Sequence, residues 1–370
     1  MLIFNFVYSE KILITRVDAI GDLICTTPLI RTIRENYPKA RISLLINKDN
    51  EDLVLTCPYV DEIVSIEFDE SQYCNEPLET YINRILYKAK EICRQKSLEN
   101  KFDLVISCCE ILNGKNSLSE FFISRLCHAK IYIGCVRADG NYKRIIHEEF
   151  HEYFYKLSFQ EYAEHEIVGQ LNMLVDSGFV VTSFREELWI SNRDKNNVDK
   201  YISQIEDFNK KLIVVVGVTG STERQNWPKE RYKKLFDLYN DDNSVIFIIL
   251  GAGDAANCYK GLANNKNVID GINKFSLNSI AIIISMADIY LGANTGLMHM
   301  ANVYGLKQLV LQPVCKNDRY LSGSGETRWC GLGAESLSII PPESIKDISV
   351  DKVYWQLNVL LNESRLQRQQ

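Results

Sequence analysis

Short apolar runs rich in β-branched residues alternate with segments of helical periodicity along the whole chain. In the first half, these runs predict strands over residues 11–16, 41–46, 62–66, 103–107 and 130–133. Helical patterns follow over residues 23–36, 78–95 and 162–176. Nearly continuous apolar runs of this length are typical of strands that are covered on both faces.

The second half repeats the same alternation. Its predicted strands are residues 212–216, 245–250, 267–269, 288–291 and 308–311. Its predicted helices are residues 230–239, 255–264, 277–286, 297–303 and 350–361. Strands that alternate with helices indicate βαβ units and parallel sheets.

Two such sets predict an α/β protein of two Rossmann-like, doubly wound domains that face a central cleft. We place the boundary in the polar stretch 191–200, which gives an N-terminal domain over residues 1–190 and a C-terminal domain over residues 191–370. The last helix is compatible with either domain. Ligands of such sheets bind at the carboxyl ends of the strands, so the loops there are the places to look for chemistry.

Composition and charge argue against a nucleic-acid-binding protein and against a metal site. The net charge of −6 is uneven, with 20 Lys and Arg against 27 Asp and Glu in residues 1–180, and 22 against 21 in the remainder. No dense Lys/Arg cluster suggests a nucleic-acid interface. None of the eleven cysteines forms a CxxC pair, so reduced thiols and no metal site are expected.

The N-terminus lacks the pattern of a signal peptide, and the longest apolar stretch, residues 280–293, is broken by Asp288 and too short to span a bilayer. We therefore expect a cytoplasmic protein. The apolar residues 2–8 are expected to extend an edge strand, with peripheral membrane contact as the alternative.

The loop after the first predicted strand contains Asp18, Gly21 and Asp22. Gly21 permits a tight turn and a close approach by a ligand. Asp22 then lies at the start of a helix, where it could act as the N-cap, as a general base, or as both. The helix dipole would favour its ionised form.

Two loops of the second half carry weaker signals. Residues 217–228 offer backbone N–H groups and the hydroxyls of Thr219, Ser221 and Thr222, which suit a phosphate. Residues 251–254 follow a strand but do not form a dinucleotide fingerprint. Asp254 could cap the next helix or accept a hydrogen bond from a ribose hydroxyl.

A more specific signal is the turn Asn294-Thr295-Gly296, between a strand and a helix. Asn294 could cap this helix, and the N–H groups of Thr295 and Gly296 would then stabilise a pyrophosphate. His299 lies four residues after Thr295 on the same helix face, where it is either a donor ligand or a core residue.

With the segments 16–22 and 294–299 in view, the chain resembles the bacterial heptosyltransferases of glycosyltransferase family 9. The likeness extends through Thr26-Thr27-Pro28-Leu29, Trp227-Pro228 and Phe275-Ser276-Leu277. It covers almost the whole chain.

The resemblance implies a fold of the GT-B type, with the acceptor on the N-terminal domain and a nucleotide sugar, typically ADP-heptose, on the C-terminal domain. It also implies an inverting reaction with no metal or other cofactor, in which Asp22 is the base and Asp18 and Gly21 belong to the acceptor-side loop. The implied donor-binding residues are Thr219, Gly220, Ser221, Arg224, Gln225, Asp254, Phe275, Asn294, Thr295, Gly296 and His299. The implied acceptor is a glycan or lipid-linked glycan, such as the lipopolysaccharide core.

Two positions depart from the family pattern. Gln225 stands where the family often has Lys, although the adjacent Arg224 could supply a cation, and Asn294 stands where it often has Asp. These departures motivate an alternative: a nucleotide-sugar-binding pseudoenzyme or assembly subunit without transfer activity. A third interpretation is an epimerase that acts on a UDP-sugar. The acceptor, the linkage and the oligomeric state stay open.

Overall fold

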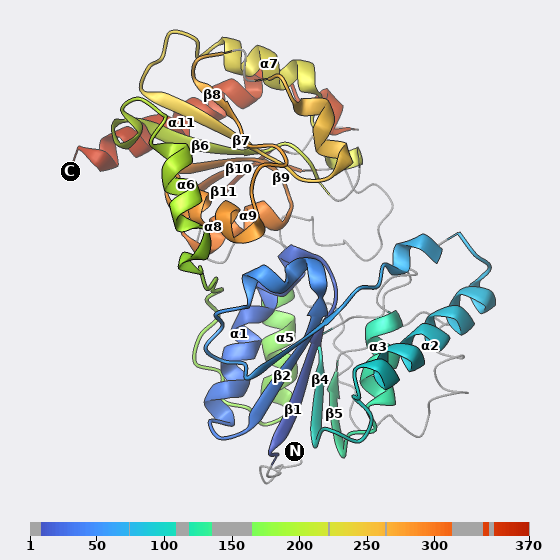
Figure 1. Cartoon of the computed structure of the whole chain (residues 1–370). Helices are drawn as coiled ribbons and strands as arrows, with labels where there is room; N and C mark the ends of the chain where they lie inside the picture. The colour runs from blue at the N-terminus through green and yellow to red at the C-terminus, as the bar shows by residue number, and fades with distance from the viewer. Residues whose placement is uncertain are drawn as a thin grey trace. The chain divides into compact units, whose positions relative to one another are not determined.

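The computed structural model describes residues 9–73, 75–108, 118–134, 165–220, 223–262, 265–312, 336–339 and 344–369. The chain divides into two compact units, unit 1 (Met1–Glu187) and unit 2 (Leu188–Gln370). Each unit is built on one parallel sheet with helices on both faces (Figure 1).

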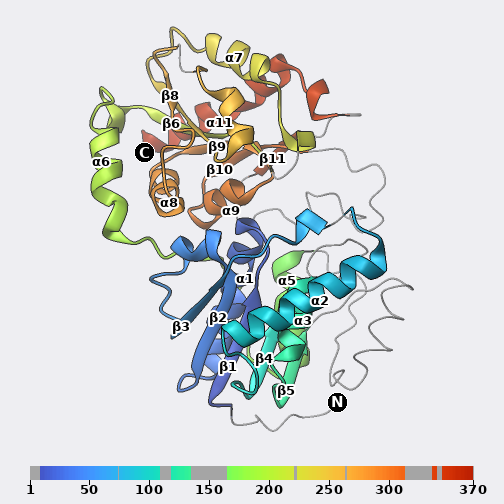
Figure 2. The same cartoon turned by 45° about the vertical axis from the view of Figure 1, so that its right-hand side comes forward.

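Unit 1 has a five-stranded sheet in the order β3-β2-β1-β4-β5. The strands are β1 (Lys11–Arg16), β2 (Arg41–Asn47), β3 (Glu62–Ile66), β4 (Leu104–Ser107) and β5 (Ile131–Gly134). The helices are α1 (Ile20–Asn36), α2 (Leu78–Gln95), α3 (Leu118–Leu126) and α5 (Glu166–Asp176), with short 3-10 helices η1 (Lys48–Leu53) and η2 (Glu70–Tyr73). Figures 1 and 2 show α1 and α5 on one face of this sheet, and α2 and α3 on the other.

Successive residues of the unit 1 strands point to opposite faces of the sheet and contribute to the apolar core on each face. Leu13, Leu45 and Val105 belong to the buried cluster formed with α2 and α3. Their neighbours Ile12 and Ile14 are equally buried and point to the opposite face, because successive strand residues alternate. Coverage of both faces explains why the runs in the sequence are continuously apolar.

Unit 2 has a six-stranded sheet in the order β11-β10-β9-β6-β7-β8. The strands are β6 (Leu212–Gly217), β7 (Val245–Leu250), β8 (Val268–Asp270), β9 (Ile289–Ala293), β10 (Lys307–Leu311) and β11 (Ser336–Ile339). The helices are α6 (Lys195–Ile202), α7 (Lys229–Asp237), α8 (Leu277–Ser285), α9 (Gly296–Val303) and α11 (Val350–Arg368). The 3-10 helices are η4 (Asn192–Asp194), η5 (Phe208–Lys210), η6 (Glu223–Gln225), η7 (Asp254–Tyr259) and η8 (Ile345–Asp347).

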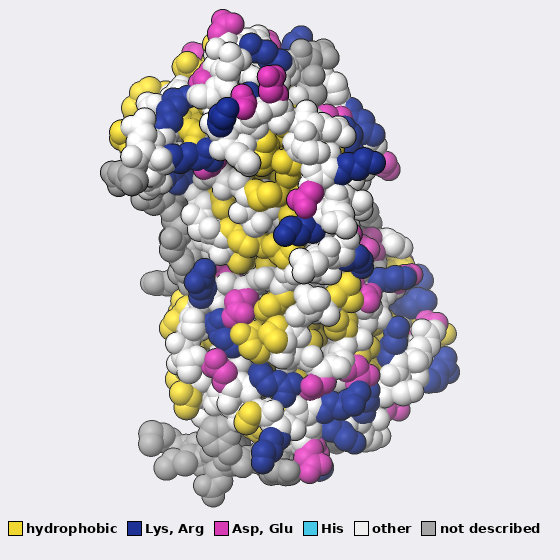
Figure 3. Space-filling view, turned by 60° about the vertical axis from the view of Figure 1, so that its left-hand side comes forward, with side chains coloured by type: hydrophobic (Ala, Val, Ile, Leu, Met, Phe, Trp, Pro, Cys, Tyr) yellow, Lys and Arg dark blue, Asp and Glu magenta, His cyan; other side chains and the backbone are white. Residues whose placement is uncertain are grey.

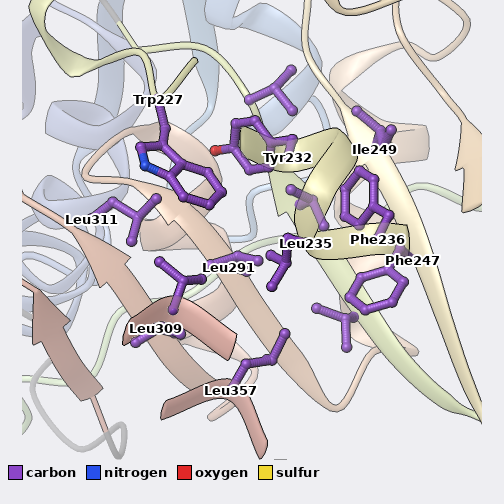
Figure 4. Close-up of a cluster of buried hydrophobic side chains, with 14 of the residues drawn as sticks. Trp227, Tyr232, Leu235, Phe236, Phe247, Ile249, Leu291, Leu309, Leu311 and Leu357 are labelled. Atoms are coloured by element: carbon purple, nitrogen blue, oxygen red, sulfur yellow. The ribbon is translucent and has the colours of Figure 1, made fainter. Parts of the chain in front are cut away.

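One face of the unit 2 sheet packs against α7 and α11. Figure 4 shows the centre of this core, where Trp227 and Tyr232 meet edge to face with ring centroids 4.7 Å apart. Leu357 of α11 belongs to the same cluster. The last helix therefore completes the core of unit 2.

At the amino-terminal ends of several strands, an aspartate side chain accepts a hydrogen bond from a backbone N–H of the adjacent strand. Asp103 accepts hydrogen bonds from the N–H groups of Glu10 and Lys11 at 3.1 Å each. Asp61 accepts from Ile42 at 2.7 Å, and Asp288 accepts from Ile213 at 2.7 Å. These carboxylates satisfy backbone N–H groups at the amino-terminal edges of the sheets, whereas ligands of such sheets bind at the opposite, carboxyl edges.

The predicted doubly wound α/β arrangement is confirmed in both units, and most strand bounds agree within two residues. Among the described α-helices and strands, three were not predicted, namely α3, α6 and β11. The helix predicted over 255–264 is the shorter 3-10 helix η7.

Within the described parts of the chain, every helix is too short or too polar to cross a bilayer. On the face drawn in Figure 3, basic and acidic side chains are interspersed over the described surface.

Candidate functional site

In unit 1, the buried Arg16 ends β1 beside β4, where the strand order of the sheet reverses. Its side chain is only 2% exposed. Nη1 donates to the carbonyl of Cys108 at 2.6 Å, just beyond β4, while Nη2 donates to Asp22 Oδ1 at 2.9 Å and to Glu166 Oε1 at 3.1 Å. A reversal of strand order is the position where doubly wound sheets bind ligands.

The charge of Arg16 is maintained by its acidic surroundings. Burial alone would lower the pKa of the guanidinium, but the carboxylates of Asp22, Asp18 and Glu166 raise it well above its ordinary value. Arg16 is therefore a permanent cation within this cluster. A buried cation is tolerated only when it is paired and hydrogen-bonded in this way.

Asp22 lies in the first turn of α1, with its side chain 22% exposed. The prediction that Asp22 caps the helix is wrong, because α1 begins at Ile20 and the extended residue Ala19 occupies the N-cap position. Gly21 is likewise inside the helix, so the turn from the strand is made by the residues before it. The first turn still favours a carboxylate, because the N-terminal end of a helix is partially positive.

Glu120 of α3 fixes the loop that leads to Asp22. One carboxyl oxygen accepts the backbone N–H of Val17 at 2.9 Å, and the other accepts the hydroxyls of Thr15 at 2.8 Å and Ser107 at 3.2 Å. Burial, together with the nearby Asp18, raises the pKa of Glu120 to about 7.

Asp18 stands on the other side of Arg16. Its Oδ2 lies 3.6 Å from Arg16 Nε, and its backbone carbonyl accepts a hydrogen bond from Asn50 Nδ2 at 2.9 Å. The predicted acceptor-side residues Asp18 and Gly21 thus adjoin Asp22 in unit 1.

In unit 2, the loops after β6 and β9 come together at the reversal between these two adjacent strands. Gln225 Nε2 donates to the carbonyl of Asn294 at 3.3 Å, which joins the predicted phosphate loop to the predicted pyrophosphate turn. The N–H of Gly220 donates to Asn226 Oδ1 at 2.8 Å. A Cβ atom at Gly220 would lie 2.4 Å from Gln225 Cβ, so this loop requires glycine.

The Asn294–Gly296 turn differs in one respect from the prediction. Thr295, in extended conformation, occupies the N-cap of α9, and no described side chain caps this helix. Asn294 precedes the cap, and its Nδ2 donates instead to Gln312 Oε1 at 3.5 Å. The helix begins at Gly296, so its first-turn N–H groups are presented at the carboxyl edge of the sheet, as an anion site requires.

At the carboxyl edge of the unit 2 sheet, β6 and β9 pack closely against each other. A Cβ atom at Gly292 of β9 would collide with the carbonyl oxygen of Gly217 at the end of β6. A Cβ at Gly217 would in turn lie 2.6 Å from the Tyr290 hydroxyl. Glycine at both positions lets the two strands and their loops approach each other.

The remaining predicted donor residues lie at three places in unit 2. His299 is buried on α9. Phe275 packs edge-on against Tyr201 with ring centroids 4.8 Å apart, beside the end of β8. Asp254 is exposed and opens η7 without capping it, because Gly253 is the N-cap. Its Oδ1 accepts a hydrogen bond from Asn257 Nδ2 at 3.3 Å.

Thr219 lies in the described part of the loop after β6. Ser221 lies outside the described residues, as does the side chain of Arg224.

Arg16, Glu120 and Glu166 were not predicted as members of the site. Arg16 at the end of an otherwise apolar strand was a signal that it is functional, since a strand covered on both faces rarely ends in a buried charge. Glu120 and Glu166 lie far from Asp22 in the sequence, and only the tertiary structure brings them to Arg16.

Comparisons with known proteins agree with this arrangement. The family model described as glycosyltransferase family 9 (heptosyltransferase) matches residues 95–311, more than half of the chain. None of the curated proteins matches the chain.

Several solved structures share the fold. A family 9 glycosyltransferase from Veillonella parvula superposes with a TM-score of 0.73 at 16% identity, covering 96% of this chain and 98% of the other. The E. coli ADP-heptose lps heptosyltransferase II gives 0.62 at 15% identity, covering 96% and 99%. The E. coli heptosyltransferase WaaC, solved with ADP, gives 0.64 at 14% identity, covering 95% and 99%.

Two doubly wound units with polar loops gathered at each reversal of strand order, together with these matches, define a glycosyltransferase of the GT-B type. The chain belongs to glycosyltransferase family 9, the heptosyltransferase family.

Proposed function

We propose that this protein transfers a heptose, or a related sugar, from an ADP-sugar to a hydroxyl of a lipopolysaccharide-core or other glycan acceptor. The family and the fold support transfer of a sugar from a nucleotide donor. The observation that carries the proposal is the hydrogen bond from Arg16 Nη2 to Asp22 Oδ1 at the reversal of strand order in unit 1.

In the proposed reaction, Asp22 accepts the proton of the acceptor hydroxyl as its oxygen attacks the anomeric carbon of the donor. The bond from that carbon to the diphosphate oxygen breaks, and ADP leaves with the electron pair. Attack from the face opposite the leaving group inverts the anomeric carbon. Arg16 favours the ionised form of Asp22, which is the form that can take a proton.

The leaving diphosphate would be stabilised by unit 2. The first-turn N–H groups of α9 and the loop around Gly220 are suited to hold its developing negative charge. These groups would do so without a metal ion. Gln225, which joins the two loops through the Asn294 carbonyl, would hold them in register rather than neutralise the phosphate.

The base assignment is tested with Asp22→Asn, which keeps the size and an acceptor oxygen but removes the basicity. We expect loss of transfer by a factor of about 10²–10⁴ with ADP-heptose and a panel of glycan acceptors, because general base catalysis contributes about that much. The shift in melting temperature caused by ADP should stay at the wild-type value. Transfer at the wild-type rate in Asp22→Asn would refute the assignment.

The donor is tested separately by thermal denaturation with ADP-, UDP-, GDP- and CDP-sugars. A ligand that binds the folded state raises the melting temperature by mass action. We expect ADP-heptose to give the largest rise, whereas a larger rise with a UDP-sugar would contradict the proposed donor. Tight binding of ADP-heptose with no ADP release across the acceptor panel would favour the alternative of a binding protein without transfer activity.

A further inference from the structure

Glu166 and Asp22 share one donor nitrogen of Arg16. Glu166 lies in the first turn of α5, and its side chain is 5% exposed. Its Oε1 accepts hydrogen bonds from Arg16 Nη2 at 3.1 Å and from Gln170 Nε2 at 3.0 Å. The same Arg16 nitrogen donates to Asp22 Oδ1 at 2.9 Å.

This sharing matters because a general base changes its charge during each turnover. When Asp22 takes a proton it becomes neutral, and Arg16 loses one of its counter-charges. A buried guanidinium without a carboxylate partner is strongly destabilised, which would make Asp22 reluctant to accept the proton. The Glu166 side chain is more deeply buried than that of Asp22, at 5% against 22% exposed, and its Oε1 lies 3.1 Å from Arg16 Nη2.

We propose that Glu166 is a positioning residue for Asp22, which holds Arg16 in place and neutralises it while Asp22 alternates between its ionised and protonated forms. The inference rests on the proposed role of Asp22 as the base. The proton passes from the acceptor hydroxyl to the Asp22 carboxylate, and Glu166 stays ionised and takes no proton.

Other groups of the described residues also face this cluster. They are Asp18 from the loop after β1, Cys25 from α1, Cys108 after β4, Glu120 from α3, and Glu186 after α5. Burial raises the pKa values of the Cys25 and Cys108 thiols, so both stay neutral at physiological pH. The tests below leave all of these groups in place.

The direct test is the titration of the Asp22 carboxyl, followed by its ¹³Cγ chemical shift in the full chain and assigned with Asp22→Asn. Glu166→Gln removes a like charge, so the midpoint of Asp22 should fall by about 1 pH unit. Arg16→Met removes the opposite charge, so the midpoint should rise by about 1 pH unit. Glu166→Asp should restore a midpoint near that of the wild type.

A matched control is Glu70→Gln, the same substitution at another buried glutamate of unit 1. Glu70 accepts the N–H groups of Leu118 and Ser119 at the start of α3 at 3.1 and 3.0 Å. Its replacement should alter the stability of unit 1 without moving the Asp22 midpoint. A midpoint that stays constant or rises in Glu166→Gln, or that moves equally in Glu70→Gln, would overturn the inference.

If Glu166→Gln does not fold, the double variant Arg16→Met/Glu166→Leu replaces both charges by apolar side chains, which buried ion pairs often tolerate. The two removals should then nearly cancel, and a midpoint as high as that of Arg16→Met alone would overturn the inference. Transfer assays on Asp22→Asn separate the two proposals. Retained transfer refutes Asp22 as the base, whereas loss of transfer with an unmoved midpoint in Glu166→Gln refutes only the role of Glu166.

Discussion

Glu120 gives unit 1 a pH-dependent stability that one substitution should remove. Its pKa is about 7 in the folded protein, against an ordinary value of 4.5, chiefly because it is buried. The folded unit thus binds this proton more tightly than the unfolded chain does. The contribution of Glu120 to stability is therefore greatest at low pH and is lost as the pH rises from about 4.5 to about 7.

The size of the effect follows from these two values. Relative to its value at low pH, stability falls by about 3 kcal/mol at pH 8, where the buried Glu120 is ionised, and by about 1 kcal/mol at pH 5, where folding must protonate a group that is mostly ionised in the unfolded chain. Glutamine avoids this cost and can keep the hydrogen bonds: its amide oxygen can accept from Val17, and its NH₂ group can donate to the hydroxyl oxygens of Thr15 and Ser107. Glu120→Gln should therefore stabilise unit 1 relative to the wild type, and this gain in the free energy of unfolding should be about 2 kcal/mol larger at pH 8 than at pH 5.

Urea denaturation at pH 5 and pH 8 measures this difference. Residues 1–187, which form unit 1, contain no tryptophan, whereas Trp227 is buried in the core of unit 2. Tryptophan fluorescence therefore follows unit 2, and far-UV circular dichroism follows both units. The fluorescence transition serves as an internal control that the substitution should leave in place. Equal effects of Glu120→Gln at the two pH values, or a loss of stability at pH 8, would refute the reasoning.

Two further predictions concern unit 2. Leu357→Ala in the core contact of α11 should lower the free energy of unfolding of unit 2 by about 2–5 kcal/mol, measured by tryptophan fluorescence in urea. Leu366→Ala on the same helix, at a side chain 61% exposed, should change this free energy by less than about 0.5 kcal/mol. Equal losses in the two variants would show that α11 does not complete the core. Gly220→Ala should push Gln225 away from the Asn294 carbonyl and weaken ADP binding, seen as a smaller rise in melting temperature with ADP, and an undiminished rise would contradict the role of this loop.

Much of the fold could be predicted because each strand is a local apolar run covered on both faces. The run of β1 and the run of β7 predict their strands to the residue. The failures occur where local signals are weak: β11 is a short strand of alternating Ser, Leu and Ile, and α6 lies in a polar stretch interpreted as a domain boundary. In both places tertiary packing decides the structure.

The candidate site shows the same limit. The loops that carry Asp22 and Asn294 could be found from the sequence, because each follows a strand that ends at the carboxyl edge of a sheet. The cap of α1 was predicted three residues too late, at Asp22, and the cap of α9 one residue too early, at Asn294, since Ala19 and Thr295 cap by backbone conformation alone. The pairing of Arg16 with Glu166 and the hydrogen bond from Val17 to Glu120 could not be found, because both glutamates reach this loop from distant parts of the sequence.

The position of α11 also governs the order in which the two units can fold during synthesis. The core of unit 1 is drawn from segments that have all been made once α5 is complete. The core of unit 2 instead lacks one wall until Val353, Leu357 and Leu361 have left the ribosome. A nascent chain that pauses before residue 350 would carry a folded unit 1 and a second sheet whose apolar face lacks the cover of α11, and exposed apolar surface of this kind is recognised by chaperones and proteases.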